Sequence, residues 1–222
     1  MKVHKITSRD EYLDVQIQRS KQKYDYCMVN VSEVKFFHNI LKPILGDVGP
    51  ILCLGTRNGR EIDLFRNIFF GNKYLNKIIS MLENKHLGYT AKWPFIESLF
   101  RSNLNKIYKK DVIGVELNPN AKREDTWIGS FDEMPKYWSG KFSLLYSNSF
   151  DQSMDPLKTA LEWKRVLREG GIIIMGFAEG AEPTESDPVG NISYGDLLKL
   201  FGGELIFFSK YGFHYSYLVI SL

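Results

Sequence analysis

The stretch Ile51-Leu-Cys-Leu-Gly-Thr-Arg-Asn-Gly-Arg-Glu61 decides the fold of this chain of 222 residues. Four apolar residues lead directly into Gly55, and Gly59 follows four positions later. From Ile62 onward, apolar residues recur at the spacing of an amphipathic helix. This order predicts a buried strand, a glycine turn and a helix, which together open a nucleotide-binding α/β unit. Glycine permits the positive φ of such a turn, and the free N–H groups at the helix start suit an anionic or polar ligand.

Length and composition fit one globular domain. Hydrophobic residues make up 44% of the chain and charged residues 25%, with a net charge of +3, which is typical of a folded protein. The two cysteines, Cys27 and Cys53, are too few for a disulfide framework, so we expect a reducing, cytoplasmic location. No apolar run reaches the roughly 18 residues of a membrane span, and the first residues do not resemble a signal peptide.

Hydrophobic spacing and turn residues predict the other elements. We expect helices that begin at a Ser8–Glu11 capping pattern and end near residue 22, and helices over about 32–42, 60–70 and 156–168, with a short one capped by Ser193 and Asp196. Strands are predicted at 51–54, 111–116, 126–128, 142–147 and 172–177. The segments 204–209 and 215–220 are predicted to form an antiparallel pair, and 178–191 a loop.

Residues 71–110 interrupt this order with a predicted helical hairpin. Apolar residues recur at helical spacing on both sides of Trp93-Pro94, over a length that a simple βαβ connection does not need. The segment carries eight Lys or Arg and two acids, a net charge of +6, whereas the rest of the chain has −3. This charge and the interspersed aromatic residues suit an anionic partner such as a phosphorylated substrate, RNA or an anionic surface. A helical cap with solvated lysines is the favoured interpretation, because charge runs usually face water.

Five pieces of sequence resemble class I S-adenosylmethionine-dependent methyltransferases of the type-11-like kind. They occur in that family's order and are Cys53–Gly59, Gly114–Pro119, Gly129–Pro135, Phe142–Ser153 and Glu162–Ile172. The resemblance covers about residues 48–222. A nicotinamide-dependent dehydrogenase is disfavoured, because it more often has three glycines as G-x-G-x-x-G and does not need the terminal strand pair.

The resemblance implies an α/β fold. We expect a Rossmann-like, seven-stranded, mostly parallel sheet with an antiparallel last strand and helices on both faces. A single domain over 1–222 would then include N-terminal helices as a cap over 1–47 and the helical-hairpin insertion at 71–110.

The resemblance also implies S-adenosyl-L-methionine as cofactor and a methyltransferase activity. By position, it assigns cofactor contacts to Gly55, Thr56, Arg57, Gly59, Glu116, Leu117, Ser130, Phe131 and Asn148. Glu116, at the end of a predicted strand, should accept hydrogen bonds from both ribose hydroxyls, since a carboxylate offers two acceptor oxygens. The alternative for Glu116 is an ordinary surface acid at a strand end.

Other assigned residues keep open alternatives. Phe131 either covers the adenine or fills the core. Asn148 either contacts the amino-acid end of the cofactor or the substrate, or it forms a turn. Arg57 either grips the methionine carboxylate with its planar fork or faces solvent.

The sequence departs from the family at three cofactor positions. Cys53 and Ser130 stand where the family often has an acid, and Arg57 stands where it often has a glycine. Serine can still hydrogen-bond the adenine amine, but more weakly than a carboxylate does. These departures support a second hypothesis, in which the chain is a catalytically degenerate protein that keeps the methyltransferase fold for binding or regulation.

Methyl transfer is a displacement at a sulfonium methyl, so the protein mainly aligns the acceptor and excludes water. An oxygen or nitrogen acceptor can also need a base, for which the candidates are Asp151 and either Tyr24 or Tyr26 in the N-terminal segment. The alternative for Asp151 is a helix N-cap. The cysteines and histidines have no spacing that would hold a metal. A small-molecule or saccharide acceptor is expected in preference to nucleic acid.

Overall fold

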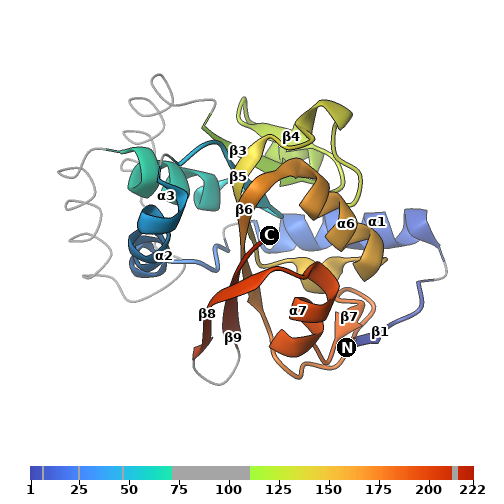
Figure 1. The fold of residues 1–222 in the computed structure, drawn as a ribbon. Helices are drawn as coiled ribbons and strands as arrows, with labels where there is room; N and C mark the ends of the chain where they lie inside the picture. Colours follow the sequence, from blue (N-terminus) through green and yellow to red (C-terminus); the bar gives the residue numbers. More distant parts are fainter. Residues whose placement is uncertain (7, 25, 47, 72–110, 212–214) are drawn as a thin grey trace.

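In the computed structural model, a seven-stranded mixed sheet carries helices on both faces (Figure 1). The structure describes residues 1–222 except 7, 25, 47, 72–110 and 212–214. The strand order is β4-β3-β2-β5-β6-β9-β8. The strands are β2 Ile51–Leu54, β3 Val112–Glu116, β4 Thr126–Ile128, β5 Phe142–Ser147, β6 Leu167–Phe177, β8 Glu204–Tyr211 and β9 Tyr215–Ser221. Neighbours from β4 to β6 are parallel, whereas β9 is antiparallel to β6 and β8, so the predicted fold class is confirmed.

The central strands are apolar because helices cover both of their faces. Every residue of β2 and of β5 is buried, as is typical of parallel strands inside an α/β sheet. Cys53 of β2 pairs with Gly114 on one side and with Tyr146 on the other. The carboxyl ends of β2, β3 and β5 therefore meet at one edge of the sheet, which is where open α/β sheets bind ligands.

In the part of the chain that the structure describes, two helices pack on each face of the sheet. Figure 1 shows α2 (Val31–Leu45) and α3 (Arg60–Phe70) on one side, and α6 (Pro156–Val166) and α7 (Tyr194–Phe201) on the other. The predicted apolar face of α2, formed by Val34, Phe37 and Leu41, is fully buried. On the opposite face, the ring of Trp163 lies between 5.5 and 5.8 Å from three other rings, those of Phe131, Phe150 and Phe201.

The first helix, α1 (Arg9–Gln22), has a different character. Its N-cap is Ser8, whose side chain accepts a hydrogen bond from the Glu11 N–H, as predicted. Its buried side chains are Tyr12, Gln16 and Ser20, which all carry polar groups. Among the described residues of α1, none belongs to either apolar core. Burial of apolar surface therefore does not explain why α1 sits where it does.

Several boundaries differ from the predicted ones. α6 ends at Val166 and β6 begins at Leu167. We expected the helix to reach about residue 168 and the strand to begin only at 172. The expected loop at 178–191 ends in a two-residue strand, β7 (Val189–Gly190), which pairs with β1 (Lys2–Val3). Two-residue strands, like the one-turn helices η1 (Pro119–Ala121), η2 (Lys136–Trp138) and η3 (Phe150–Gln152), are too short to show periodicity.

The predicted helical hairpin at 71–110 falls, apart from Gly71, outside the residues that the structure describes, so it stays a prediction. Within the described ranges, no helix combines the length and the apolar composition that a membrane span requires.

Replacing Phe201 by alanine should destabilise the fold through the core of α6 and α7. The ring is fully buried against Trp163 and Phe150, and loss of a buried phenylalanine costs about 3–5 kcal/mol. Leu157→Ala on α6 is the control, because that side chain is 60% exposed and its loss should cost less than about 0.5 kcal/mol. Urea unfolding of both variants measures the two costs, and equal midpoint shifts would contradict this account of the core.

Candidate functional site

A sharp bend follows β2 and carries three residues with positive φ. They are Gly55, Arg57 and Gly59, at 72°, 45° and 79°. At Gly55 a Cβ atom would lie 2.4 Å from the Ser149 hydroxyl oxygen, so both the conformation and the space require glycine there. Arg57 shares a positive φ with only one other described non-glycine residue, Asn191. Such strained positions gather at functional sites, because a rigid surrounding must hold them.

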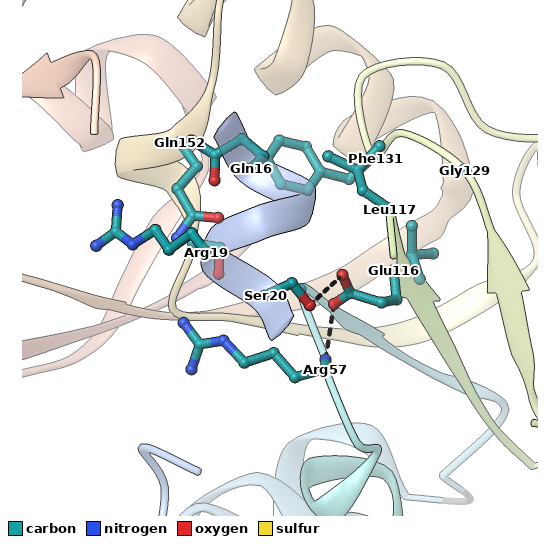
Figure 2. Close-up of a pocket in the computed structure, with 12 residues that line it drawn as sticks. Gln16, Arg19, Ser20, Arg57, Glu116, Leu117, Gly129, Phe131 and Gln152 are labelled. Atoms are coloured by element: carbon teal, nitrogen blue, oxygen red, sulfur yellow. Dashed lines mark hydrogen bonds between the residues drawn. The ribbon is translucent and has the colours of Figure 1, made fainter. Parts of the chain in front are cut away.

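The carboxylate of Glu116 lies directly at this bend. It stands at the end of β3 and is 5% exposed. Its Oε2 accepts a hydrogen bond from the Arg57 N–H at 2.7 Å. Its Oε1 accepts from the Ser20 hydroxyl at 3.0 Å, and Figure 2 shows this contact together with that from Arg57. The same Oε1 accepts from the Asn118 N–H at 3.0 Å. The structure therefore brings the glycine bend and the predicted ribose acceptor into one site, and Glu116 is no ordinary surface acid.

Helix α1 covers this site and is held there by polar contacts. Ser20 reaches Glu116, as described above, and the Tyr12 hydroxyl donates to the Gln152 carbonyl at 2.6 Å. Gln16 Nε2 donates to the Ser186 carbonyl at 2.5 Å. These partners lie at the carboxyl end of β3 and beyond the carboxyl ends of β5 and β6, so α1 spans that edge of the sheet.

The bend, the end of β3 and α1 enclose a cavity of about 420 Å³ that includes its open mouth. Its lining residues are Gln16, Arg19, Ser20, Gly55, Arg57, Val115, Glu116, Leu117, Gly129, Phe131, Ser149 and Gln152. Five predicted cofactor residues are thus on its wall, namely Gly55, Arg57, Glu116, Leu117 and Phe131.

Four other predicted residues lie beside the cavity but do not line it. Thr56 is buried and points toward β3, since a Cβ on Gly114 would lie 2.8 Å from its hydroxyl oxygen. Gly59 lies against Arg123. The Ser130 hydroxyl accepts from the Asp132 N–H at 3.1 Å, and the Asn148 side chain accepts from the Ser149 hydroxyl at 3.2 Å.

Phe131 lies in the core and also reaches the cavity. It is 7% exposed and belongs to the core, where its ring lies 5.7 Å from that of Trp163. The same residue also lines the cavity. A core position and a ligand-facing edge are therefore compatible for this ring.

The side chain of Arg57 extends toward the segment after α1. Its guanidinium carbon lies 5.2 Å from the centre of the Tyr26 ring, and its Nη1 donates to the Tyr26 carbonyl at 3.4 Å. Arg57 therefore rests on an aromatic face instead of projecting into open solvent. Tyr24 is 39% exposed and is not among the residues that line the cavity.

Asp151 lies in η3, between the cavity residues Ser149 and Gln152. Its Oδ1 is buried and has no hydrogen-bond partner. Burial raises the pKa of Asp151 to about 7, with a further contribution from the charge of Asp187. Arg19 and Arg57 act in the opposite direction and lower that pKa. The proposed N-cap role for Asp151 was wrong, because Asp155 caps α6.

Sequence reasoning missed the site residues that α1 supplies. Gln16 and Ser20, together with Tyr12, are spaced four residues apart, which places them on one face of a helix. That face is polar, and a helix without an apolar stripe needs some other reason to be buried. The four-residue spacing is visible in the sequence. The hydrogen-bond acceptors that explain it are distant in sequence and are known only from the structure. Within the described part of the chain, no cluster of His, Cys, Asp or Glu is arranged to hold a metal ion.

Comparison with known proteins identifies the fold. No protein-family model and no curated protein matches the sequence. The structure is similar to 1,6-didemethyltoxoflavin-N1-methyltransferase from Burkholderia thailandensis, solved with 1,6-didemethyltoxoflavin and S-adenosylhomocysteine (TM-score 0.55, 13% identity, covering 97% of this chain and 91% of that chain).

Two further solved structures agree with that likeness. One is a SAM-dependent methyltransferase from Aquifex aeolicus (TM-score 0.50, 11% identity, covering 87% of this chain and 99% of that chain). The other is a TehB-like SAM-dependent methyltransferase from Corynebacterium glutamicum (TM-score 0.50, 14% identity, covering 96% and 98%). The chain therefore has the class I methyltransferase fold.

Asp151→Asn should remove a pH dependence from the stability of the fold. An unfolded aspartate titrates near about 3.9, whereas the pKa of folded Asp151 is about 7. Between these values the folded protein keeps a proton that the unfolded chain has lost, so this group lowers stability as pH rises and adds no further change above about 7. Urea unfolding at several pH values should show the wild type losing stability relative to the variant across that window. A difference in unfolding free energy between wild type and variant that does not change with pH would contradict the assigned pKa.

Proposed function

Because the chain has the class I methyltransferase fold, we propose that it binds S-adenosyl-L-methionine and transfers the methyl group to an oxygen or nitrogen acceptor. The hydrogen bond from the Arg57 N–H to Glu116 carries this proposal, since it joins the glycine bend to a strand-end carboxylate in one cavity. The similar protein from Burkholderia thailandensis was solved with S-adenosylhomocysteine, which supports the same class of cofactor here.

The residues present fit this cofactor. Gly55 leaves a space that a Cβ atom would fill, and Glu116 offers two acceptor oxygens to ribose hydroxyls. One of its three present donors is the Ser20 hydroxyl, which a ribose hydroxyl replaces if α1 shifts. Leu117 and Phe131 would contact the adenosine, and Arg57 the methionine carboxylate. Thr56, Gly59, Ser130 and Asn148 would act through the shape of the neighbouring backbone.

The bound cofactor would supply an activated methyl group, and this chain would supply alignment, cover and a proton acceptor. Helix α1 covers the cavity and limits the access of water. We assign the role of base to Asp151, because a pKa of about 7 suits proton transfer at neutral pH and its Oδ1 has no other partner. Asp151 does not itself line the cavity, but its chain neighbours Ser149 and Gln152 do. Tyr24 is 39% exposed and is the weaker candidate.

The enclosure of the site supports a proposal for the acceptor class. A cavity roofed by a helix suits a small molecule or saccharide better than a nucleic acid strand. An anionic partner of residues 71–110 and a cytoplasmic location stay predictions from the sequence.

A second candidate is a binding or regulatory protein without catalysis. The observation that favours it is the Ser20–Glu116 hydrogen bond, which satisfies the ribose acceptor from within the chain. The departures at Cys53, Arg57 and Ser130 point in the same direction.

Calorimetric titration with S-adenosylhomocysteine separates these candidates. We expect binding by the wild type, and a loss of at least about tenfold in affinity, or about 1.4 kcal/mol, for Glu116→Gln, because the amide offers one acceptor oxygen instead of two. Glu169→Gln is the control, since that exposed residue lies near the amino end of β6, away from the ligand edge. Absence of heat with the wild type at millimolar ligand would favour the second candidate.

Transfer of a labelled methyl group tests catalysis and the acceptor class together. S-adenosylmethionine with a labelled methyl is incubated with separate small-molecule, saccharide, RNA and protein fractions. We expect label in a small-molecule or saccharide fraction, and a decrease of about 10²–10⁴-fold in its rate for Asp151→Asn if that carboxylate is the base. Label confined to RNA or protein would contradict the proposed acceptor, and an unchanged rate would remove Asp151 as base.

A further inference from the structure

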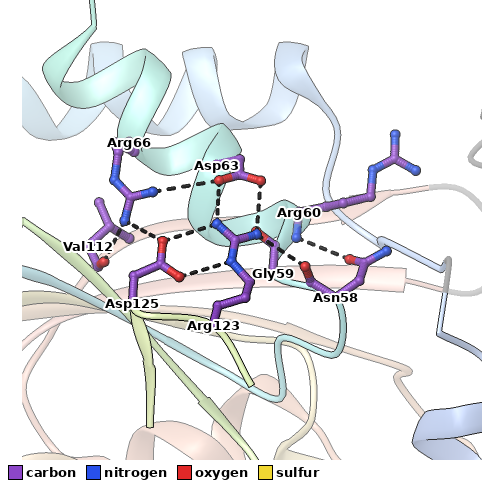
Figure 3. A network of polar contacts seen from close by, with 8 residues as sticks. All are labelled: Asn58, Gly59, Arg60, Asp63, Arg66, Val112, Arg123 and Asp125. Carbon is purple, nitrogen blue, oxygen red and sulfur yellow. Dashed lines mark hydrogen bonds and ion pairs between the residues drawn. The ribbon is translucent and has the colours of Figure 1, made fainter. Parts of the chain in front are cut away.

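Four charged side chains form a network beneath the glycine bend (Figure 3). Arg123 stands at its centre and donates to both oxygens of Asp125 at 2.9 and 3.0 Å, and to both oxygens of Asp63 at 2.7 and 3.0 Å. Arg66 is 1% exposed and lies 2.9 Å from Asp125 and 3.6 Å from Asp63. Two positive charges thus face two negative ones, so the buried network is balanced.

Arg123 also contacts the main chain of the bend itself. Its Nη1 donates to the carbonyl oxygens of Asn58 and Gly59, both at 3.1 Å. The fit is close, because a Cβ atom on Gly59 would lie only 2.5 Å from that nitrogen. Glycine is therefore needed at position 59 both for its φ of 79° and for the approach of the guanidinium.

These contacts connect two parts of the cavity wall, the glycine bend and the end of β3, on the side facing away from the cavity. Arg123 and Asp125 lie on the connection between β3, which ends in Glu116, and β4. The Asp125 carbonyl accepts from the Gly114 N–H at 2.8 Å, which ties this connection back to β3. Asn58 lies next to Arg57, whose N–H reaches Glu116 on the cavity side. Arg123 thus links the bend to the strand that carries Glu116.

We propose that Arg123 is a positioning residue, whose guanidinium fixes the glycine bend against the β3–β4 connection and so presets the distance between the bend and Glu116 for an adenosyl ligand. This inference rests on the proposed function. Arg123 lies behind the bend and does not line the cavity, so it acts through Asn58 and Gly59. Lysine cannot replace it, because one ammonium nitrogen cannot reach two carboxylates and two carbonyls in the fixed geometry of a fork.

Arg123→Lys tests this role, and Arg165→Lys is its matched control. Arg165 also binds one carboxylate in a fork, that of Glu162, at 2.7 and 2.8 Å. It also donates to the main-chain carbonyls of Met134, Pro135 and Lys136, none of which lines the cavity. Both variants keep the charge and lose comparable contacts, so a general loss of stability should affect them alike.

The affinity for S-adenosylhomocysteine is measured by calorimetry well below the melting temperature of each variant. We expect Arg123→Lys to weaken binding at least tenfold and Arg165→Lys to change it less than threefold. Equal losses in the two variants, or an unchanged affinity for Arg123→Lys, would overturn the proposal. If Arg123→Lys fails to fold, Asp63→Asn is the substitute, because it weakens the contacts of the same guanidinium. We expect it to weaken binding at least threefold, and a smaller change would contradict the positioning role of Arg123.

Hydrogen exchange of the protein without ligand tests the role of Arg123 independently of the proposed function. Peptides over 55–61 should exchange faster in Arg123→Lys than in the wild type and in Arg165→Lys. If the wild type binds no S-adenosylhomocysteine, the proposed function fails, and the exchange rates still decide whether Arg123 holds the bend. Unchanged exchange at 55–61 would overturn the positioning role even if the ligand binds.

Discussion

The site depends on one buried carboxylate that must find hydrogen-bond donors. Glu116 is 5% exposed, and an ionised group at that depth is costly unless its oxygens are satisfied. Two of its donors are main-chain N–H groups, those of Arg57 and Asn118, which a side-chain substitution cannot remove. The Arg57 donor is available only because the bend turns through positive φ at three positions. The conformation of the bend and the burial of the Glu116 carboxylate therefore support each other.

The cover of the site is attached by a different kind of force from the rest of the fold. α2 and α6 bury phenylalanine, leucine and tryptophan side chains, whereas α1 presents Tyr12, Gln16 and Ser20 to its neighbours. A hydrogen bond contributes about 0.5–1.5 kcal/mol net, because it replaces bonds to water, while a buried large apolar side chain contributes about 1.5–3 kcal/mol. These contacts hold α1 less firmly than apolar packing holds the helices that face the sheet, which agrees with the proposed function, in which a ligand enters beneath α1.

The sequence predicted best what periodicity and turn chemistry control. The strand at 51–54, the apolar face of α2 and the cap at Ser193 follow from local patterns, and the position of Glu116 follows from a strand end. Residues whose role depends on a partner distant in sequence could not be found in this way. Ser20 meets Glu116 across 96 positions, and Arg123 meets Gly59 across 64. Asp151 was found as a candidate, but its unsatisfied oxygen and raised pKa depend on Asp187 and on burial, which appear only in three dimensions.

The position of Cys53 shows why a departure from a family pattern need not weaken a site. An acid there, as the resemblance implies, would support the bend from the strand that precedes it. Cys53 is fully buried, and burial raises the pKa of its thiol, with a further contribution from the charge of Glu61, so it stays neutral and cannot give ionic support. In this chain the ionic support comes from the opposite side, where the Arg123 guanidinium holds the carbonyls of the bend and two carboxylates hold the guanidinium. Because the two guanidinium groups and the two carboxylates of this network offset one another's charge, the bend is held without a charge on β2.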